Sequence, residues 1–174
     1  MKLIEPTEEY CGGIREYRRE FLAEGSSMDG TASLERFEDP LAWLAYVRAC
    51  TDPAALPPGR VPATQYLYVD EESGKIAGMI QIRHFLNEYL AAYGGHIGYS
   101  VAPGERRRGY ATEMLRLALD KCRELGLDRV LITCDRDNEG SRRTILKNGG
   151  VYESTIIEPE EGAALDRYWI DLSH

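Results

Sequence analysis

The chain has 174 residues, of which 43% are hydrophobic and 29% are charged. These are the proportions of one ordinary globular domain, and they exclude a disordered or fibrous protein. The formal net charge is -8, from 29 acidic and 21 basic side chains. Such a field repels nucleic acid and anionic membrane surfaces, so we expect neither as a partner.

The cysteines show no paired CxxC spacing, and the longest apolar stretches are far shorter than the ~20 residues that span a bilayer. We therefore predict reduced thiols in a cytoplasmic protein. No cysteine lies at a zinc-like interval from His84, His96 or His174, so no metal site is expected. The four cysteines are Cys11, Cys50, Cys122 and Cys134.

The first fifty residues predict a strand, two helices and a connection. Residues 2–4 are a strand candidate, and Ile14, Tyr17 and Phe21 recur at helical spacing in a helix that should end at Gly25. A second helical pattern covers residues 41–50. The polar, acidic stretch from residue 25 to 40 is predicted to be a mobile connection.

A hairpin is predicted next. Residues 52–62 contain four prolines, which favour an extended loop over a helix. Residues 64–69 and 76–85 are strand-like and are separated by a turn at Glu72-Ser73-Gly74-Lys75. Residues 96–101 form the third strand of this group.

The second half of the chain indicates a βαβ unit followed by a hairpin. The strand at 96–101 leads to an amphipathic helix at about 109–125, and a β-rich segment follows at 129–134. A short helix is then predicted at 140–147, and the last two strands at 151–157 and 165–172. The prediction is one α/β domain over residues 1–174, with about seven strands and four helices.

A basic loop stands between the strand at 96–101 and the helix that follows. Arg106, Arg107, Arg108 and Gly109 fill it. The free backbone N–H groups and the positive dipole end of the helix point at this loop, and Gly109 lets an anion approach without meeting a Cβ atom. Although basic runs are often only solvated surface, this position predicts a phosphate site.

The string Arg106-Arg107-Arg108-Gly109-Tyr110-Ala111 resembles the coenzyme A signature Q/R-x-x-G-x-G/A of the GNAT superfamily of N-acetyltransferases. The resemblance covers residues 94–152, whereas before residue 94 only the order of elements supports it. It implies a mixed sheet in which the parallel strands at 96–101 and 129–134 splay apart, so that the pantetheine arm of acetyl-coenzyme A enters the gap. The residues that it assigns to the coenzyme are Val101, Arg106, Arg107, Arg108, Gly109, Tyr110, Ala111, Thr112 and Asn138.

The resemblance also guides the search for a general base. His96 is the first candidate, because it lies on the strand beside the expected thioester and has an unperturbed pKa near ~6.5. An equally weighted alternative is that His96 only fills space or orients a neighbour. Glu88, Tyr99 and His84 are the reserve candidates.

The general acid and the acceptor pocket are less defined. Many family members carry a tyrosine seven residues after the asparagine that matches Asn138, but this chain has Ile145 there. Ser141 is then the candidate acid, with a helix-capping role as the alternative. The acceptor-binding candidates are the polar residues that leave the strand before the coenzyme strand, namely Arg83, His84, Asn87 and Glu88.

The expected activity is direct transfer of an acetyl group to the primary amine of a small molecule or peptide in a ternary complex, by a monomer or homodimer. Two alternatives stay open. The domain could bind coenzyme A only as a sensor or regulatory module, or it could be an interaction protein that uses the acidic stretch 25–40.

Overall fold

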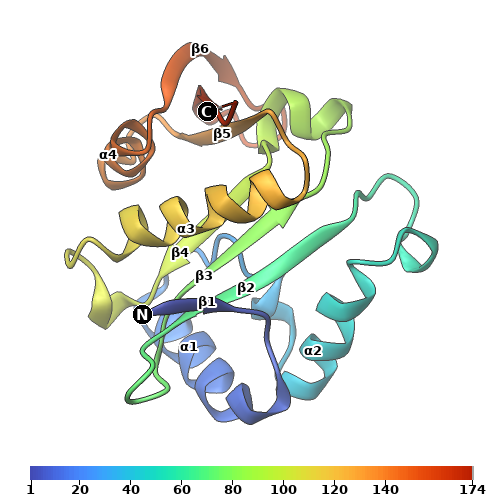
Figure 1. Ribbon diagram of the computed structural model, residues 1–174, viewed down its shortest axis with the longest axis vertical. Coiled ribbons are helices and arrows are strands. Elements are labelled where there is room, and N and C mark those ends of the chain that lie inside the picture. Colours follow the sequence, from blue (N-terminus) through green and yellow to red (C-terminus); the bar gives the residue numbers. More distant parts are fainter. Residues whose placement is uncertain (174) are drawn as a thin grey trace.

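The computed structural model describes residues 1–173, with seven strands and four α-helices in this part of the chain (Figure 1). The helices are α1 (Cys11–Glu24), α2 (Pro40–Ala49), α3 (Tyr110–Glu124) and α4 (Glu139–Lys147). The strands are β1 (Lys2–Ile4), β2 (Ala63–Val69), β3 (Ile76–Arg83), β4 (Ile97–Val101), β5 (Arg129–Asp135), β6 (Val151–Ile157) and β7 (Ala164–Asp171). The predicted fold class and element order are confirmed.

The strands form two sheets. One has the order β1-β2-β3-β4 and the other β5-β7-β6, and every neighbouring pair is antiparallel. The expectation of one mixed sheet is therefore corrected: β4 and β5 are edge strands of separate sheets. They are joined just before β4, where the His96 N–H donates to the Leu131 carbonyl at 2.8 Å.

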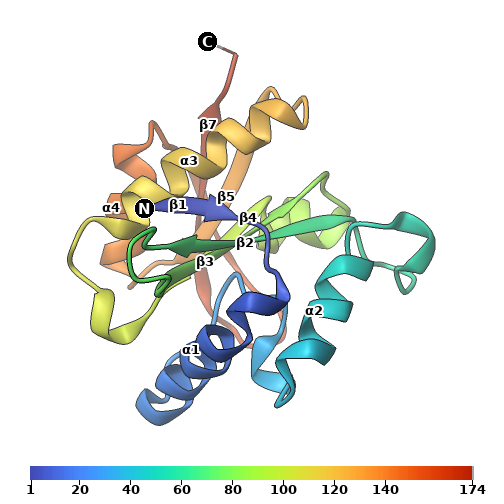
Figure 2. The ribbon, with the colours of Figure 1, turned by 60° about the horizontal axis from the view of Figure 1, so that its bottom comes forward.

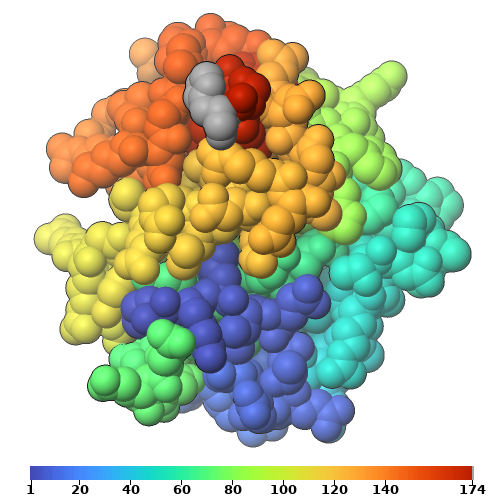
Figure 3. Space-filling view, viewed as in Figure 1, coloured from blue at the N-terminus to red at the C-terminus, as the bar shows by residue number. Residues whose placement is uncertain are grey.

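Helices cover both faces of the first sheet (Figure 2). Leu67 and Met79 pack in the core with α1 and α2, whereas Tyr68 and Ile80 pack in a second core with α3 and the strands of the other sheet. The outer face of α3 crosses the surface between the N-terminal strand and the C-terminal part of the chain (Figure 3). Helix α3 thus joins the two sheets through a shared core.

Helix α1 follows the predicted pattern. Ile14, Tyr17 and Phe21 are at most 2% exposed, because their spacing places them on the face that packs against the sheet. Gly25 ends the helix with a left-handed φ of 79°. The first turn differs, since Glu8–Tyr10 is a 3₁₀ turn and the α-helix begins at Cys11.

The connection between α1 and α2 is not a loose loop, so that prediction is wrong. Thr31 is only 1% exposed, and its carbonyl accepts a hydrogen bond from the Trp43 indole at 2.8 Å. The side-chain amide of Gln65 donates to the Gly30 carbonyl at 2.7 Å. These contacts fix the connection against β2 and α2.

The segment after β3 holds a π-helical turn, Leu90–Gly94, that the sequence analysis did not predict. Arg167 of β7 anchors this turn by donating to the carbonyls of Ala91 at 2.5 Å and Ala92 at 2.6 Å. Strand β3 ends at Arg83, two residues earlier than predicted. Within residues 1–173, no helix is long and apolar enough to cross a lipid bilayer.

Candidate active site

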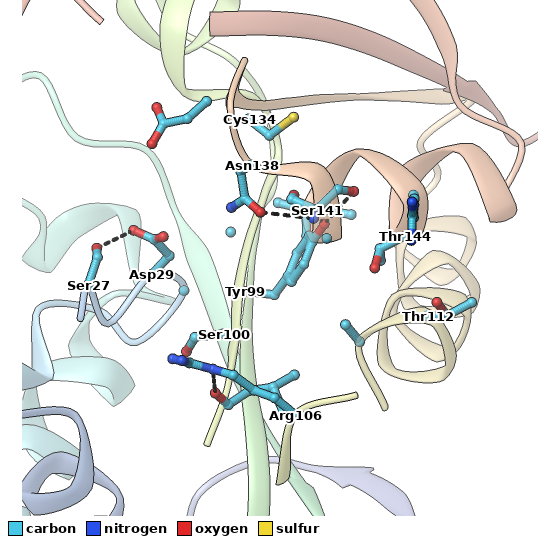
Figure 4. A pocket seen from close by; sticks show the side chains of 18 of the residues that line it. Ser27, Asp29, Tyr99, Ser100, Arg106, Thr112, Cys134, Asn138, Ser141 and Thr144 are labelled. Atoms are coloured by element: carbon cyan, nitrogen blue, oxygen red, sulfur yellow. Dashed lines mark hydrogen bonds between the residues drawn. The ribbon is translucent and has the colours of Figure 1, made fainter. Parts of the chain in front are cut away.

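A cavity of about 860 Å³ lies where β4 and β5 separate. Its walls are β4, the loop from residue 105 to 112, the end of β5 and the first turns of α4. Residues 26–30 of the α1–α2 connection close it from the other side. Figure 4 shows Ser27 and Asp29 on one side of β4 and Ser141 and Thr144 on the other.

The loop before α3 presents its main chain to this cavity. Gly109 precedes the helix with a φ of 78°, and no side chain of residues 1–173 caps the first turn. The N–H groups of Tyr110, Ala111 and Thr112 therefore have no acceptor within the helix. A Cβ atom on Gly109 would meet no protein atom within 4 Å, so this part of the cavity is open space. Free N–H groups at a helix N-terminus suit a phosphate group.

Two of the loop's arginine side chains are held by carboxylates. Arg106 donates to Glu24 at 2.9 Å, and it also lies 5.6 Å over the Phe21 ring. Arg108 pairs with Glu105 at 3.1 Å. Arg107 adopts a left-handed φ of 65° and lines the cavity. The main chain, rather than these two side chains, is thus the unpaired donor set.

Strand β4 supplies a second set of unpaired main-chain groups, along one of its edges. Its residues pair with β3 on one side, with Val101 opposite Gly78, but β5 does not form a ladder with it on the other. The cavity occupies the space beside residues 97–101. An extended ligand can therefore pair with β4 as an added strand does.

Side chains of β4, β5 and α4 meet near the centre of the cavity. Asn138 accepts the Ser141 N–H at 3.1 Å and so caps α4, while its Nδ2 group has no partner among the residues described. The Tyr99 hydroxyl lies 2.7 Å from Ser141 Oγ. Burial raises the pKa of Tyr99 well above its usual value, and burial likewise raises the pKa of the Cys134 thiol, which also lines the cavity, to about 11. Both groups are protonated at neutral pH.

Ile145 explains why the usual helix tyrosine position is not used here. Its side chain is completely buried in the core shared by the two sheets. A Cβ atom on Gly150 would lie 2.4 Å from Ile145 Cγ2, so the helix end packs closely against it. Tyr99, which enters from β4, brings a phenol to the cavity instead.

The structure places His96 outside the cavity lining. The ring is 6% exposed, and Nδ1 accepts the Leu131 N–H at 2.9 Å. Burial, followed by the charge of Arg83, lowers the pKa of His96 to about 4. These contacts favour the structural role, because the ring joins the two sheets and is neutral at pH 7.

The other acceptor candidates are dispersed. His84 Nε2 lies 2.8 Å from Thr64 Oγ1. The His84 side chain lines neither this cavity nor the smaller cavity of about 520 Å³ that adjoins it. Asn87 donates to the Gly59 carbonyl and accepts the Leu90 N–H, so its amide is already bonded. Glu88 is exposed at the surface.

Residues of the α1–α2 connection were missed as parts of the site. A Cβ atom on Gly30 would lie 2.2 Å from the Gly98 carbonyl oxygen, so the connection lies directly against β4. This contact positions Asp29, which accepts the Ser27 hydroxyl at 2.8 Å, beside the cavity (Figure 4). The only sequence signal was a glycine after an acidic residue, which is too common to identify a site.

Two edge strands that separate beside an uncapped helix N-terminus form a cleft for an extended ligand that carries phosphate. The family model of the acetyltransferase (GNAT) family matches residues 22–149. The chain belongs to this family of acetyltransferases. No curated protein matches the chain.

Solved structures support the fold. A ribosomal-protein-S5-alanine acetyltransferase from Vibrio fischeri superposes with a TM-score of 0.74 at 16% identity, covering 97% of this chain and 91% of the other. RimJ from Mycobacterium smegmatis, in complex with CoA-disulfide, gives 0.71 at 18% identity, covering 97% and 80%. YncA from Salmonella typhimurium, a putative acetyltransferase with acetyl-CoA, gives 0.66 at 14% identity, covering 98% and 93%.

Proposed function

We propose that this protein transfers the acetyl group of acetyl-coenzyme A to an amine within a ternary complex. One observation supports this most: the unpaired edge of β4 and the uncapped N-terminus of α3 open into the same cavity. Free N–H groups at a helix N-terminus suit a diphosphate, and an unpaired strand edge suits the amides of a pantetheine arm. Several solved structures with this fold are named as acetyltransferases, which also supports the proposed acetyl transfer.

The main chain from Arg106 to Thr112 would bind the diphosphate. The N–H groups there are free, and Gly109 provides the left-handed turn that directs them. The edge of β4 near Val101 would pair with the pantetheine amides. Asn138 would donate its free Nδ2 group to the same arm, because its Oδ1 atom is already used in capping α4.

Tyr99 and Ser141 are proposed as the groups that protonate the departing thiolate. Their hydroxyls form one hydrogen bond, so either can donate while the other replaces the proton. Burial raises the pKa of Tyr99, which keeps the phenol protonated. As the amine nitrogen bonds to the acetyl carbon, the C–S bond breaks and its electron pair goes to the sulfur, which takes a proton from the Tyr99–Ser141 hydroxyls. The nitrogen releases one proton as the amide forms, and this proton returns through solvent to the deprotonated hydroxyl.

The proposal does not use His96 as the base. No histidine within residues 1–173 lines the cavity, and His96 Nδ1 already accepts a hydrogen bond from the Leu131 N–H. The amine would instead enter neutral, or lose its proton to solvent beside the exposed carboxylate of Asp29. The pH dependence of kcat/KM should then follow the ionisation of the acceptor amine.

Release of free coenzyme A thiol from acetyl-coenzyme A, measured with a panel of amino acids, peptides, polyamines and aminoglycosides, tests the proposal. A product one acetyl group heavier, found by mass spectrometry, confirms transfer rather than hydrolysis. Coenzyme binding by calorimetry with no acetylated amine would contradict the proposal and support the sensor alternative.

A further inference from the structure

A second cavity, of about 520 Å³, adjoins the first. It lies between the α1–α2 connection, the loop before β2, the end of β3 and the turn around Asn87. The two cavities share Asp29, Gly30 and Arg83 in their walls. An acceptor that approaches β4 from the side opposite α4 therefore passes this junction.

Arg83 is half-buried at the junction. Its Nη1 group donates to the carbonyls of Gly94 at 3.2 Å and Gly95 at 3.1 Å. In the part of the chain that the structure describes, Nε and Nη2 have no hydrogen-bond partner and no carboxylate forms an ion pair with the guanidinium. The charge of Asp29 favours the guanidinium only from a distance, and a partly buried charge that no carboxylate contacts is costly unless a ligand does so.

The free edge of the guanidinium selects the kind of ligand. The Nε–H and one Nη2–H group lie along the same edge of the planar guanidinium and are parallel, so they match the two oxygens of a carboxylate. Arg60 also lines the second cavity, and after burial its charge is the next cause that lowers the pKa of Arg83. Asp29 and Glu35 line the same cavity, so the place that favours an anion is the unpaired edge of Arg83 rather than the cavity as a whole.

The position of Arg83 relative to β4 limits the size of the ligand. Its Nη2 atom would lie only 3.9 Å from a Cβ atom on Gly98, so a bound carboxylate would lie close to the β4 edge. Asp29 stands at the same junction and can attract an ammonium group. Only a few bonds can separate the amine and carboxylate of a ligand held by both.

Resting on the proposed function, we infer that the acceptor is a free amino acid, whose carboxylate binds the Nε–Nη2 edge of Arg83 while its amine lies beside the Asp29 carboxylate where the two cavities meet. The second cavity then receives the side chain. Glu35 and Arg60 in its walls would set the preference among side chains.

Matched substrate pairs test the inference. Initial rates of thiol release are measured for L-amino acids and for the corresponding amino-acid amides, which lack the carboxylate but keep the amine and side chain. The amide has the more easily deprotonated amine, so it would react faster if the carboxylate did not matter. We expect at least one amino acid to exceed its amide in kcat/KM by about 10- to 100-fold, as one charge-assisted hydrogen-bond pair provides.

Variants then assign the preference to Arg83. Arg83→Met keeps the aliphatic stem and should lower the acid-to-amide ratio to one or below, mainly through KM. Because the ratio is internal to each protein, a general loss of activity or stability cancels. Arg48→Met is the control, since Arg48 is an exposed arginine of α2 that lines neither cavity, and it should keep the wild-type ratio.

The outcomes separate the inference from the proposed function. If amines are acetylated but amides or polyamines equal or exceed every amino acid, or if Arg83→Met keeps the wild-type ratio, the inference is overturned and acetyl transfer stands. If nothing is acetylated, calorimetry in the presence of coenzyme A decides. Amino-acid binding that Arg83→Met abolishes supports the inference without the reaction, and no binding refutes it.

Discussion

The buried ring of His96 makes a prediction about stability in acid. Burial and the charge of Arg83 lower its pKa from 6.5 to about 4 in the folded state. Between these two values the unfolded chain binds a proton that the folded protein does not, so unfolding becomes easier as the pH falls through this window. Well above pH 6.5, as at pH 7.5, neither state is protonated at this ring to a large extent, and nearly the full stability is present.

The size of the effect follows from the two pKa values. Between pH 7.5 and pH 5, His96 should remove about 2 kcal/mol from the free energy of unfolding. Carboxylates that titrate elsewhere do so in wild type and variant alike, so the difference between them isolates His96. His96→Gln should abolish this share of the pH dependence, because glutamine can accept the Leu131 N–H but does not titrate.

Urea unfolding of both proteins at pH 7.5, 6 and 5 measures this difference. His84→Gln serves as the control, since His84 is only half-buried and should alter the pH dependence less. Equal losses of stability in wild type and His96→Gln between pH 7.5 and pH 5 would refute the reasoning. A turnover about 10²-fold lower in a stable His96→Gln protein would instead restore the general-base role.

Three further predictions concern the coenzyme and the reaction. Gly109→Val should weaken acetyl-coenzyme A binding at least about 10-fold in calorimetry, because the new side chain would occupy the open space proposed for the diphosphate. The protein should stay folded, because the new Cβ atom meets no protein atom and the left-handed φ of 78° is the one source of strain. Ser141→Ala and Tyr99→Phe should each lower kcat by about 10- to 100-fold, with coenzyme affinity retained. The double variant should lose little more activity than either single variant, because the two hydroxyls act as one unit. Losses that multiply in the double variant would contradict this. Ile145→Tyr should not raise activity and should destabilise the protein by about 1–3 kcal/mol, measured by urea unfolding, because the larger ring does not fit the filled core.

The local structure of the basic loop and the helix after it could be predicted, while phosphate binding by this loop stays a prediction. The phosphate loop and α3 follow one another, and their glycine, their charges and the helical spacing from Tyr110 onward are local signals. Gly25 likewise ended α1 as expected, since a left-handed residue is a local requirement. The buried face of α1 could also be predicted, because Ile14, Tyr17 and Phe21 recur at helical spacing within one short segment.

Contacts between distant residues could not be predicted. Tyr99 and Ser141 are 42 residues apart, and only the separation of β4 from β5 brings them together. The α1–α2 connection has the composition of a loop, but its buried bonds come from Trp43 and Gln65, which no local pattern links to it. His96 had the right residue type for a base, while its hydrogen bond to Leu131 depends on the fold alone.

The close contact of Gly30 with Gly98 also bears on how such a protein can diversify. One wall of the cavity comes from a connection near the start of the chain, and the wall proposed to bind the coenzyme comes from segments from residue 97 onward. The two walls touch through backbone atoms of Gly30 and Gly98, and the side chains that bond to Arg106 are those of Glu24 and Ser26, not those of Ser27 and Asp29. Substitutions at Asp29 or Ser27 would therefore keep the bonds of Arg106, and under the proposed function we expect new acceptor preferences to arise from a few exchanges in this one short segment.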